Sequence, residues 1–153
     1  MNERFFQLPA EKQEKILNAG FAVFANNSYK KSPMSEIADA AGISKSLLFY
    51  YFLNKRELYL FLWNKCAELT IEYMTDYGCY EKEDLFEMMY SGLQAKMHIM
   101  RKYPDMARFV VKVFYEKDPA VCQEIQESYR KAIDFRANAS LLRLGPDKFI
   151  PGL

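Results

Sequence analysis

Residues 42–59, GISKSLLFYYFLNKRELY, combine side chains that are suited to contact a charged partner. A helix buries only one stripe of the run LLFYYF, so its other residues are exposed unless another molecule covers them. Tyr50 and Tyr51 add hydroxyl groups that can form hydrogen bonds outside the protein. Lys45 and Lys55 flank the run. Hydroxyl and ammonium groups around exposed aromatic rings indicate a surface for an anionic partner.

The charged residues are distributed unevenly, although the net charge of the 153 residues is only +1. Residues 1–56 carry eight Lys or Arg against five Asp or Glu, a net charge of +3. The remaining 97 residues carry thirteen basic and fifteen acidic side chains, a net charge of −2. A basic N-terminal part on an acidic body favours a polyanion as partner of the N-terminal part alone.

The composition excludes several classes of protein. Half of the residues are hydrophobic and 27% are charged, which is typical of a folded globular chain and not of a disordered one. No apolar run approaches the roughly 20 residues that span a bilayer, and the start, MNERFFQLPAEKQEK, lacks the apolar centre of a secretory signal. Three cysteines without C-x-x-C spacing indicate reduced thiols and a cytoplasmic location.

Helix start and stop signals predict the elements that position the run. In the N-terminal part they predict helices over about 9–26, 33–41 and 45–51. Ser32 and Ser44 are expected to cap the second and third helices through their hydroxyls. Gly42 ends the second helix because glycine readily adopts positive φ. Two short helices joined by a tight turn and preceded by a third form a helix-turn-helix, whose last helix can enter a DNA major groove.

Each position of this helix-turn-helix has an expected role. The core that sets the angle between the helices is expected to comprise Ile37, Ala38, Ala41, Ile43, Leu48 and Phe52. The side chains left on or near the outer face are Lys45, Ser46, Leu47, Phe49, Tyr50 and Tyr51.

The rest of the chain continues as helices. Asn54-Lys55-Arg56-Glu57 resembles a capping box and opens a long helix that Gly78 interrupts. Further helices are predicted over about 83–102, over 105–115, and from Pro119 to near Leu144, before Gly145-Pro146. No segment shows the two-residue alternation of a half-buried strand. The sequence therefore predicts an all-α fold.

The segment SPMSEIADAAGISKSLLFYYFLNKREL, Ser32–Leu58, resembles the DNA-binding domain of the tetracycline-repressor-like (TetR) family of bacterial transcriptional regulators. The resemblance rests on I-A-x-x-A-G-[IV]-S, the aromatic run, and F-x-x-K-x-x-L at fixed spacing, with F-A-x-x-x-Y upstream. It implies an N-terminal three-helix helix-turn-helix DNA-binding domain at residues 1–56. A helical effector-binding and dimerisation domain, apparently truncated at its C-terminal end, would occupy residues 57–153.

The resemblance also implies a set of residues that contact DNA. These residues are Ser32, Ser35, Lys45, Ser46, Leu47, Phe49, Tyr50, Tyr51 and Lys55. Phe49 stands where a tyrosine is usual in the family and Ser46 where a glycine is common, so the operator sequence stays open. For Tyr50 and Tyr51 the alternative is packing against a neighbouring helix, and for the two lysines a solvated surface.

Beyond Leu58 the chain is rich in aromatic and Met side chains, which suit an adaptable pocket between helices. The resemblance implies that a small apolar or aromatic effector binds in this region. The effector-binding residues are expected to be Trp63, Met89, Tyr90, Leu93, Met97, Phe109 and Val113. Core packing is the alternative for each of them. His98 is the single histidine and is expected to be structural or exposed, so neither a metal site nor a cofactor is expected.

The function implied by the resemblance is sequence-specific transcriptional regulation, by a repressor that the effector releases. A homodimer would bind double-stranded operator DNA, with no role for a membrane. The chain stops at PDKFIPGL, so residues after Leu153 are expected to be missing from the dimer interface. A weaker interface through Ile125, Tyr129, Ile133 and Phe135 is the alternative.

Two other functions stay open. One is a truncated regulator-like protein that acts by pairing with a full-length partner. The other is a small-molecule carrier or an enzyme on a helical scaffold, although no nucleophile–base pair and no glycine-rich phosphate loop is present, so an enzyme is not expected.

Overall fold

The computed structural model describes residues 3–141, and their side chains as far as Asp134. Within this part of the chain every regular element is a helix, which confirms the predicted all-α fold. The elements are η1 (Glu3–Phe5), α1 (Ala10–Asn26), α2 (Met34–Ala41), α3 (Lys45–Tyr51), α4 (Lys55–Asp76), η2 (Cys79–Glu81), α5 (Leu85–Lys102), α6 (Met106–Phe114) and α7 (Cys122–Leu141). None of the described helices is long and apolar enough to cross a membrane.

Local signals set most helix starts. The Asn54 side chain accepts a hydrogen bond from the Glu57 amide at 2.9 Å and caps α4, as predicted. Asp84 caps α5 by accepting from the Phe86 and Glu87 amides. The sequence predicted that the last helix starts at Pro119, and helix α7 begins three residues later, at Cys122. Its predicted end at Gly145-Pro146 lies outside the described residues.

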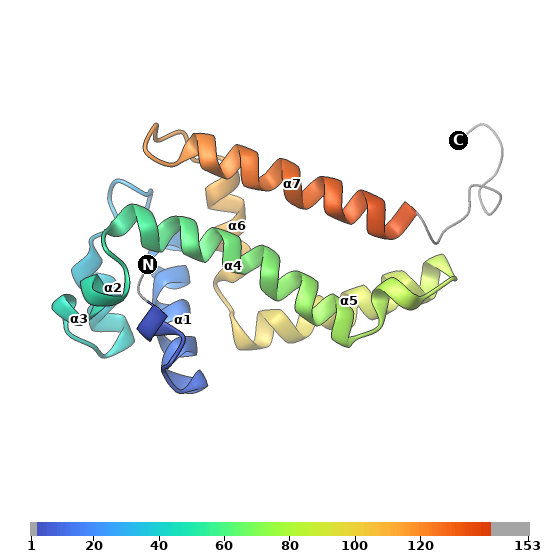
Figure 1. Cartoon of the computed structure of the whole chain (residues 1–153), viewed down its shortest axis with the longest axis horizontal. Coiled ribbons are helices and arrows are strands. Elements are labelled where there is room, and N and C mark those ends of the chain that lie inside the picture. The colour runs from blue at the N-terminus through green and yellow to red at the C-terminus, as the bar shows by residue number, and fades with distance from the viewer. Residues whose placement is uncertain (1–2, 142–153) are drawn as a thin grey trace.

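The helices form a head and an extended body (Figure 1). Helices α1, α2 and α3 gather at one end, and α4 leads from them along the molecule. Helix α5 packs beside α4, and α6 returns to pack against α1. Helix α7 contacts α4. The chain therefore leaves the head through α4 and returns to it through α6.

One aromatic cluster joins the head to the body. Phe24 of α1, Tyr59 of α4 and Phe109 of α6 are at most 2% exposed. The ring centroids of Phe24 and Tyr59 are 4.8 Å apart, and those of Tyr59 and Phe109 are 5.4 Å apart. Such edge-to-face pairs add to the stability that burial already supplies. The domain division predicted after Arg56 falls in the first turn of α4 and stays a prediction.

Candidate nucleic-acid interface and ligand cavity

The turn between α2 and α3 fixes how α3 is presented. Gly42 ends α2 with φ +68°, a conformation that favours glycine. Its amide donates a hydrogen bond to the Asp39 carbonyl at 3.1 Å. Ser44 then caps α3, because its hydroxyl accepts from the Leu47 amide at 3.1 Å. Gly42 therefore ends α2 and Ser44 caps α3, as the sequence predicted.

The inner face of α3 is buried in the head. Leu48 and Phe52 are fully buried, as are Ile37 and Ala38 of α2. Ile43 is half-buried and packs against the same core. This confirms the predicted core of the helix-turn-helix, so α3 can project its other face outward.

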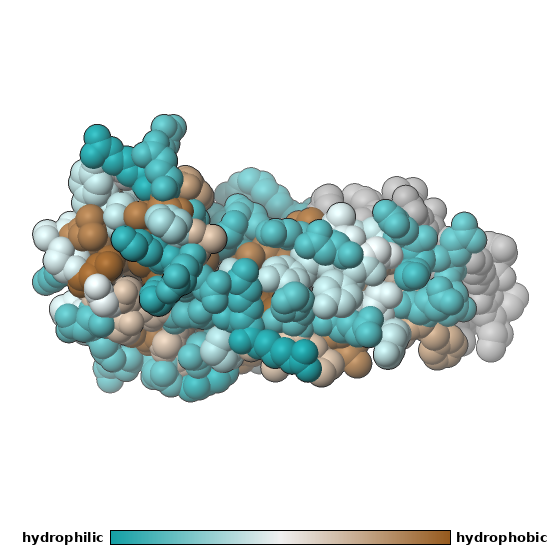
Figure 2. All heavy atoms as spheres, turned by 90° about the horizontal axis from the view of Figure 1, so that it is seen from below, coloured by the Kyte–Doolittle hydropathy of each residue, from teal (hydrophilic) through white to brown (hydrophobic). Residues whose placement is uncertain are grey.

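The outer face of α3 carries four exposed side chains. Lys45 and Ser46 lie in its first turn, and Phe49 and Tyr50 are 38% and 43% exposed. The Lys45 ammonium lies 5.9 Å from the centroid of the Phe49 ring. Leu47 is half-buried and packs on the core. Figure 2 shows hydrophobic surface at the end of the molecule that holds the head.

Arg4 contacts this face, and sequence reasoning did not single it out. Its guanidinium donates a hydrogen bond to the Tyr50 hydroxyl. The guanidinium carbon also lies 5.4 Å from the centroid of the Tyr50 ring. In the sequence Arg4 counted only as one of the basic residues of the head, because a contact over 46 positions leaves no local signal.

Tyr51 and Ser32 are buried instead of facing outward. Tyr51 is 7% exposed, and its ring centroid lies 6.2 Å from that of Phe5. This corrects the placement of Tyr51 on the outer face and favours the packing alternative. Ser32 is fully buried, and its hydroxyl donates to the Ser28 carbonyl at 2.9 Å. It does not cap α2, which Pro33 precedes without any side-chain cap.

The remaining two residues of the predicted interface lie beside α3. Ser35 is half-buried on α2. The Lys55 ammonium donates to the Lys30 carbonyl at 3.1 Å and lies 4.8 Å from the Tyr29 ring centroid. Lys55 therefore ties the start of α4 to the segment between α1 and α2, which leaves it half-buried.

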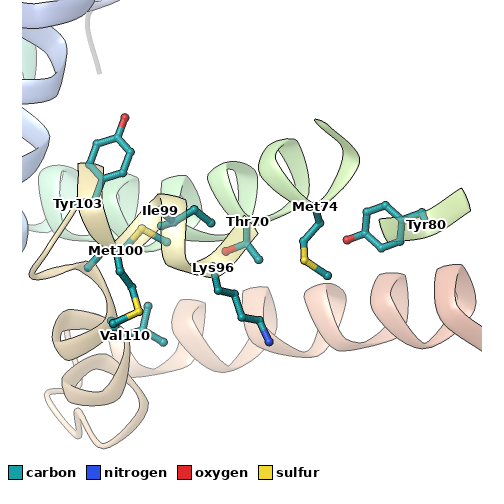
Figure 3. A pocket seen from close by; sticks show the side chains of 10 residues that line it. Thr70, Met74, Tyr80, Lys96, Ile99, Met100, Tyr103 and Val110 are labelled. Atoms are coloured by element: carbon teal, nitrogen blue, oxygen red, sulfur yellow. The ribbon is translucent and has the colours of Figure 1, made fainter. Parts of the chain in front are cut away.

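A cavity of about 410 Å³ lies between α4, η2, α5 and α6. Figure 3 shows the side chains of Met74, Lys96 and Met100 entering this space from α4 and α5. Its apolar lining comes from Met74, Ile99, Met100, Met106, Ala107 and Val110. A neighbouring cavity of about 450 Å³ shares Met74, Tyr80 and Lys96 with it. Flexible Met side chains make such a space adaptable to the shape of an apolar ligand.

The polar groups of the cavity are few. The Thr70 hydroxyl donates its proton to the Cys66 carbonyl at 2.7 Å, so it can offer a ligand only an acceptor. Burial raises the pKa of the Tyr103 hydroxyl, which therefore stays neutral. Among the described residues that line the cavity, Lys96 alone carries a full charge. The cavity thus suits an apolar molecule with at most a small anionic or polar end.

The structure does not bring the predicted effector residues into one site. Met89, Tyr90 and Leu93 line the neighbouring cavity, and Trp63 lines a third of about 110 Å³ beside α7. Phe109 and Val113 are fully buried core residues, and Met97 is 46% exposed.

The physical reason for this separation is position along α5. Met89, Tyr90 and Leu93 lie in the N-terminal half of α5 and line the neighbouring cavity, whereas Ile99 and Met100 lie near its C-terminal end and line the cavity that α6 completes. Three lining residues, Met74, Met100 and Met106, belong to the Met-rich part of the chain that the sequence marked as suited to a pocket. The sequence does not show which helices pack together, so it did not predict that these residues line one cavity.

Residues 16–61 match the sequence model of a family described as bacterial regulatory proteins, tetR family. The chain is 43% identical over 60 residues to the HTH-type transcriptional activator FasR from Mycolicibacterium smegmatis, an alignment that covers 39% of this chain and 27% of FasR. It is 23% identical over 125 residues to the HTH-type transcriptional regulator RutR from Escherichia coli, covering 80% of this chain and 57% of RutR.

Solved structures share the fold. The fatty acid degradation regulator FadR from Bacillus halodurans superimposes with a TM-score of 0.67 at 19% identity, over 92% of this chain and 75% of that protein. A TetR family transcriptional regulator from Chloroflexus aurantiacus superimposes with a TM-score of 0.57 at 24% identity, over 96% and 72%.

An N-terminal helix-turn-helix followed by a helical body defines the class of protein. Residues 16–61 carry the match to the tetR family of bacterial regulatory proteins, and the helical fold of the whole described chain is shared with a solved member of that family. It spans 27% of the length of FasR and 57% of the length of RutR.

Proposed function

We propose that this chain is a sequence-specific, DNA-binding transcriptional regulator that acts in the bacterial cytoplasm as a homodimer. Helix α3 would enter the major groove of double-stranded operator DNA, and a second copy would place its own α3 in a later turn of the groove. One observation carries this proposal. The inner face of α3 is buried, while Lys45, Ser46, Phe49 and Tyr50 project together from its outer face.

Each of these side chains has chemistry suited to DNA. Lys45 lies in the first turn of α3 and can donate to a guanine edge or to a phosphate. Ser46 can donate to a base or a phosphate. Phe49 has no hydroxyl, so it can contact a sugar or a thymine methyl. The Tyr50 hydroxyl can donate to a phosphate oxygen. The half-buried Ser35, Leu47 and Lys55 would contribute from the edge of this face.

The cavity between α4, α5 and α6 would bind a small apolar or aromatic effector. Met106 and Val110 of α6 line it, whereas Phe109 on the same helix packs against the α1 residues Phe21 and Phe24. An effector that shifts α6 would therefore shift α1 and the head that rests on it. The effector would release DNA to the extent that it binds better to a head orientation that does not fit the operator.

The test is binding to the DNA upstream of this chain's own gene, from about 50 to about 200 mM salt. A Lys45→Ala/Tyr50→Ala double variant tests the outer face of α3. Lys112→Ala, an exposed lysine of α6, controls for the lost charge. We expect tight binding that falls steeply with salt for the wild type and the control, and loss of the preference for this DNA in the double variant.

Binding no better than to random DNA, unchanged in the double variant, would overturn the proposal. Pairing with a full-length regulator would then be the leading alternative. The described side chains that favour it are the α7 residues Tyr129 and Ile133, which are 40% and 45% exposed. This pair is smaller than the set of four side chains exposed on the outer face of α3, so the observations favour DNA binding.

A further inference from the structure

We propose that the N-terminal 3-10 helix η1 forms part of the DNA-contacting surface, and that Arg4 contacts a DNA phosphate together with Tyr50. This inference rests on the proposed function. Helix η1 lies outside residues 16–61, which match the family, so the comparison assigns it no role.

The segment is fixed to the head by its aromatic residues. Phe5 is 1% exposed, and its ring centroid lies 5.1 Å from that of Phe52 and 5.3 Å from that of Phe61. The Gln13 side chain of α1 donates to the Leu8 carbonyl at 2.8 Å. Arg4 therefore projects from an anchored backbone. Little conformational freedom of the chain has to be lost when it meets a ligand.

The hydrogen bond between Arg4 and Tyr50 determines what the hydroxyl can do. The Tyr50 oxygen accepts from the guanidinium. Its own proton then points elsewhere and can be donated. Phosphate oxygens are acceptors, so a donating hydroxyl and a guanidinium side by side match them. A guanidinium presents its N–H donors in a planar fork, and this fork matches phosphate oxygens in the paired geometry that arginine favours.

The position of Arg4 also agrees with the charge of the face. Tyr50 is 43% exposed on the side of α3 that carries Lys45 and Ser46. The guanidinium lies 5.4 Å from the Tyr50 ring centroid, so it stays next to the ring. The sequence of α3, KSLLFYY, contains one cationic residue, Lys45, and Arg4 of η1 places a second cation beside this helix.

The experiment compares Arg4→Gln with the wild-type chain on the DNA upstream of its own gene and on a random duplex of equal length. Removing one phosphate contact should lower the slope of log K against log salt by about 0.9. It should also weaken binding roughly tenfold at the lower salt concentration. Arg4→Lys keeps the charge and should retain the slope. Lys112→Gln removes a charge from the body and should leave both quantities unchanged.

A Tyr50→Phe variant tests the joint action of the two residues. If Arg4 and Tyr50 hold one phosphate, Tyr50→Phe should weaken binding much less in the Arg4→Gln background than in the wild type. Independent effects of the two substitutions would contradict a shared phosphate.

Three outcomes separate this inference from the proposed function. Wild-type binding that depends on salt, with an unchanged slope and affinity in Arg4→Gln, overturns the role of Arg4 alone. A lower melting temperature with weaker binding at every salt concentration and an unchanged slope would show that Arg4 only supports α3, and this also overturns it. A wild-type chain with no preference for the upstream DNA overturns both proposals.

Discussion

The ring of Phe109 in α6 packs against the ring of Phe21 in α1, with centroids 5.4 Å apart and planes tilted by 47°. Both side chains are fully buried. Helix α6 therefore meets the cavity with one side and helix α1 of the head with the other. The same short helix therefore packs against the head and forms one wall of the cavity.

Phe109→Ala should lower the free energy of unfolding by roughly 3–5 kcal/mol, because it removes a large buried ring and leaves a space. Phe114 lies on the same helix but is 55% exposed, so Phe114→Ala should cost less than about 1 kcal/mol. Urea unfolding of both variants measures the difference. Equal losses would contradict a role for the inner face of α6 in joining the head to the body.

Gly42→Ala should destabilise the chain by about 1–2 kcal/mol, the usual cost of a left-handed backbone at a residue with a Cβ. Apart from Gly42 and its two chain neighbours, no atom of the described residues lies within 4 Å of the position that a Cβ would take, so the cost comes from the backbone and not from a clash. Gly42→Asn should cost less, because asparagine adopts positive φ more readily. Thermal unfolding of the two variants provides the comparison, and an alanine variant as stable as the wild type would rule out this explanation.

Ala107→Trp should block the cavity between α4, α5 and α6, since Ala107 lines it. We expect the dissociation constant of an anilinonaphthalene sulfonate dye to rise by about tenfold or more, because the ring occupies apolar space that the dye needs. Val111→Trp is the matched control, because Val111 is 59% exposed on the same helix and does not line the cavity.

Fluorescence titration measures the affinity for the dye, and binding to the upstream DNA without dye shows whether the head is intact. Equal dye affinity in the two tryptophan variants would place the dye elsewhere on the chain.

Tyr59→Phe should change how stability depends on alkaline pH. Tyr59 is 2% exposed, and burial raises its pKa far above the usual value of about 10. The folded chain therefore keeps this proton where the unfolded chain releases it. The contribution of Tyr59 to stability is complete below pH about 10 and is lost as pH rises toward the raised pKa.

The phenylalanine variant should lose stability less steeply than the wild type above pH about 10, as measured by urea unfolding at several pH values. Tyr103→Phe should change the slope in the same direction, because burial also raises the pKa of Tyr103. Identical slopes for the wild type and Tyr59→Phe would contradict the assignment.

The family comparison agrees with the resemblance seen in the sequence, but it covers only part of the chain. The segment Ser32–Leu58 lies wholly within the matched residues 16–61. The solved structures that resemble the whole chain are less than 25% identical to it in sequence, so for the body they show only the fold. The effector, the dimer and the release of DNA therefore stay proposals.

Local features of the sequence were sufficient to predict the helices. Ser44 and Asn54 cap helices by accepting from amides three residues ahead, and Gly42 ends α2 through its own backbone. Such interactions involve neighbours in the chain, so residue types and their spacing disclose them. The same holds for Leu48 and Phe52, whose helical spacing indicated one buried face.

Tertiary structure alone decided which side chains share a surface. Tyr50 and Tyr51 are adjacent and chemically identical, yet Tyr50 is 43% exposed and Tyr51 is 7% exposed. Phe5 packs beside Tyr51, and Arg4 donates a hydrogen bond to Tyr50, although each partner is 46 residues away in the sequence. The cavity likewise forms where three helices meet. Burial depends on all neighbours in space, so only the packed chain determines it, whereas the sequence by itself determined the helices and the helix-turn-helix.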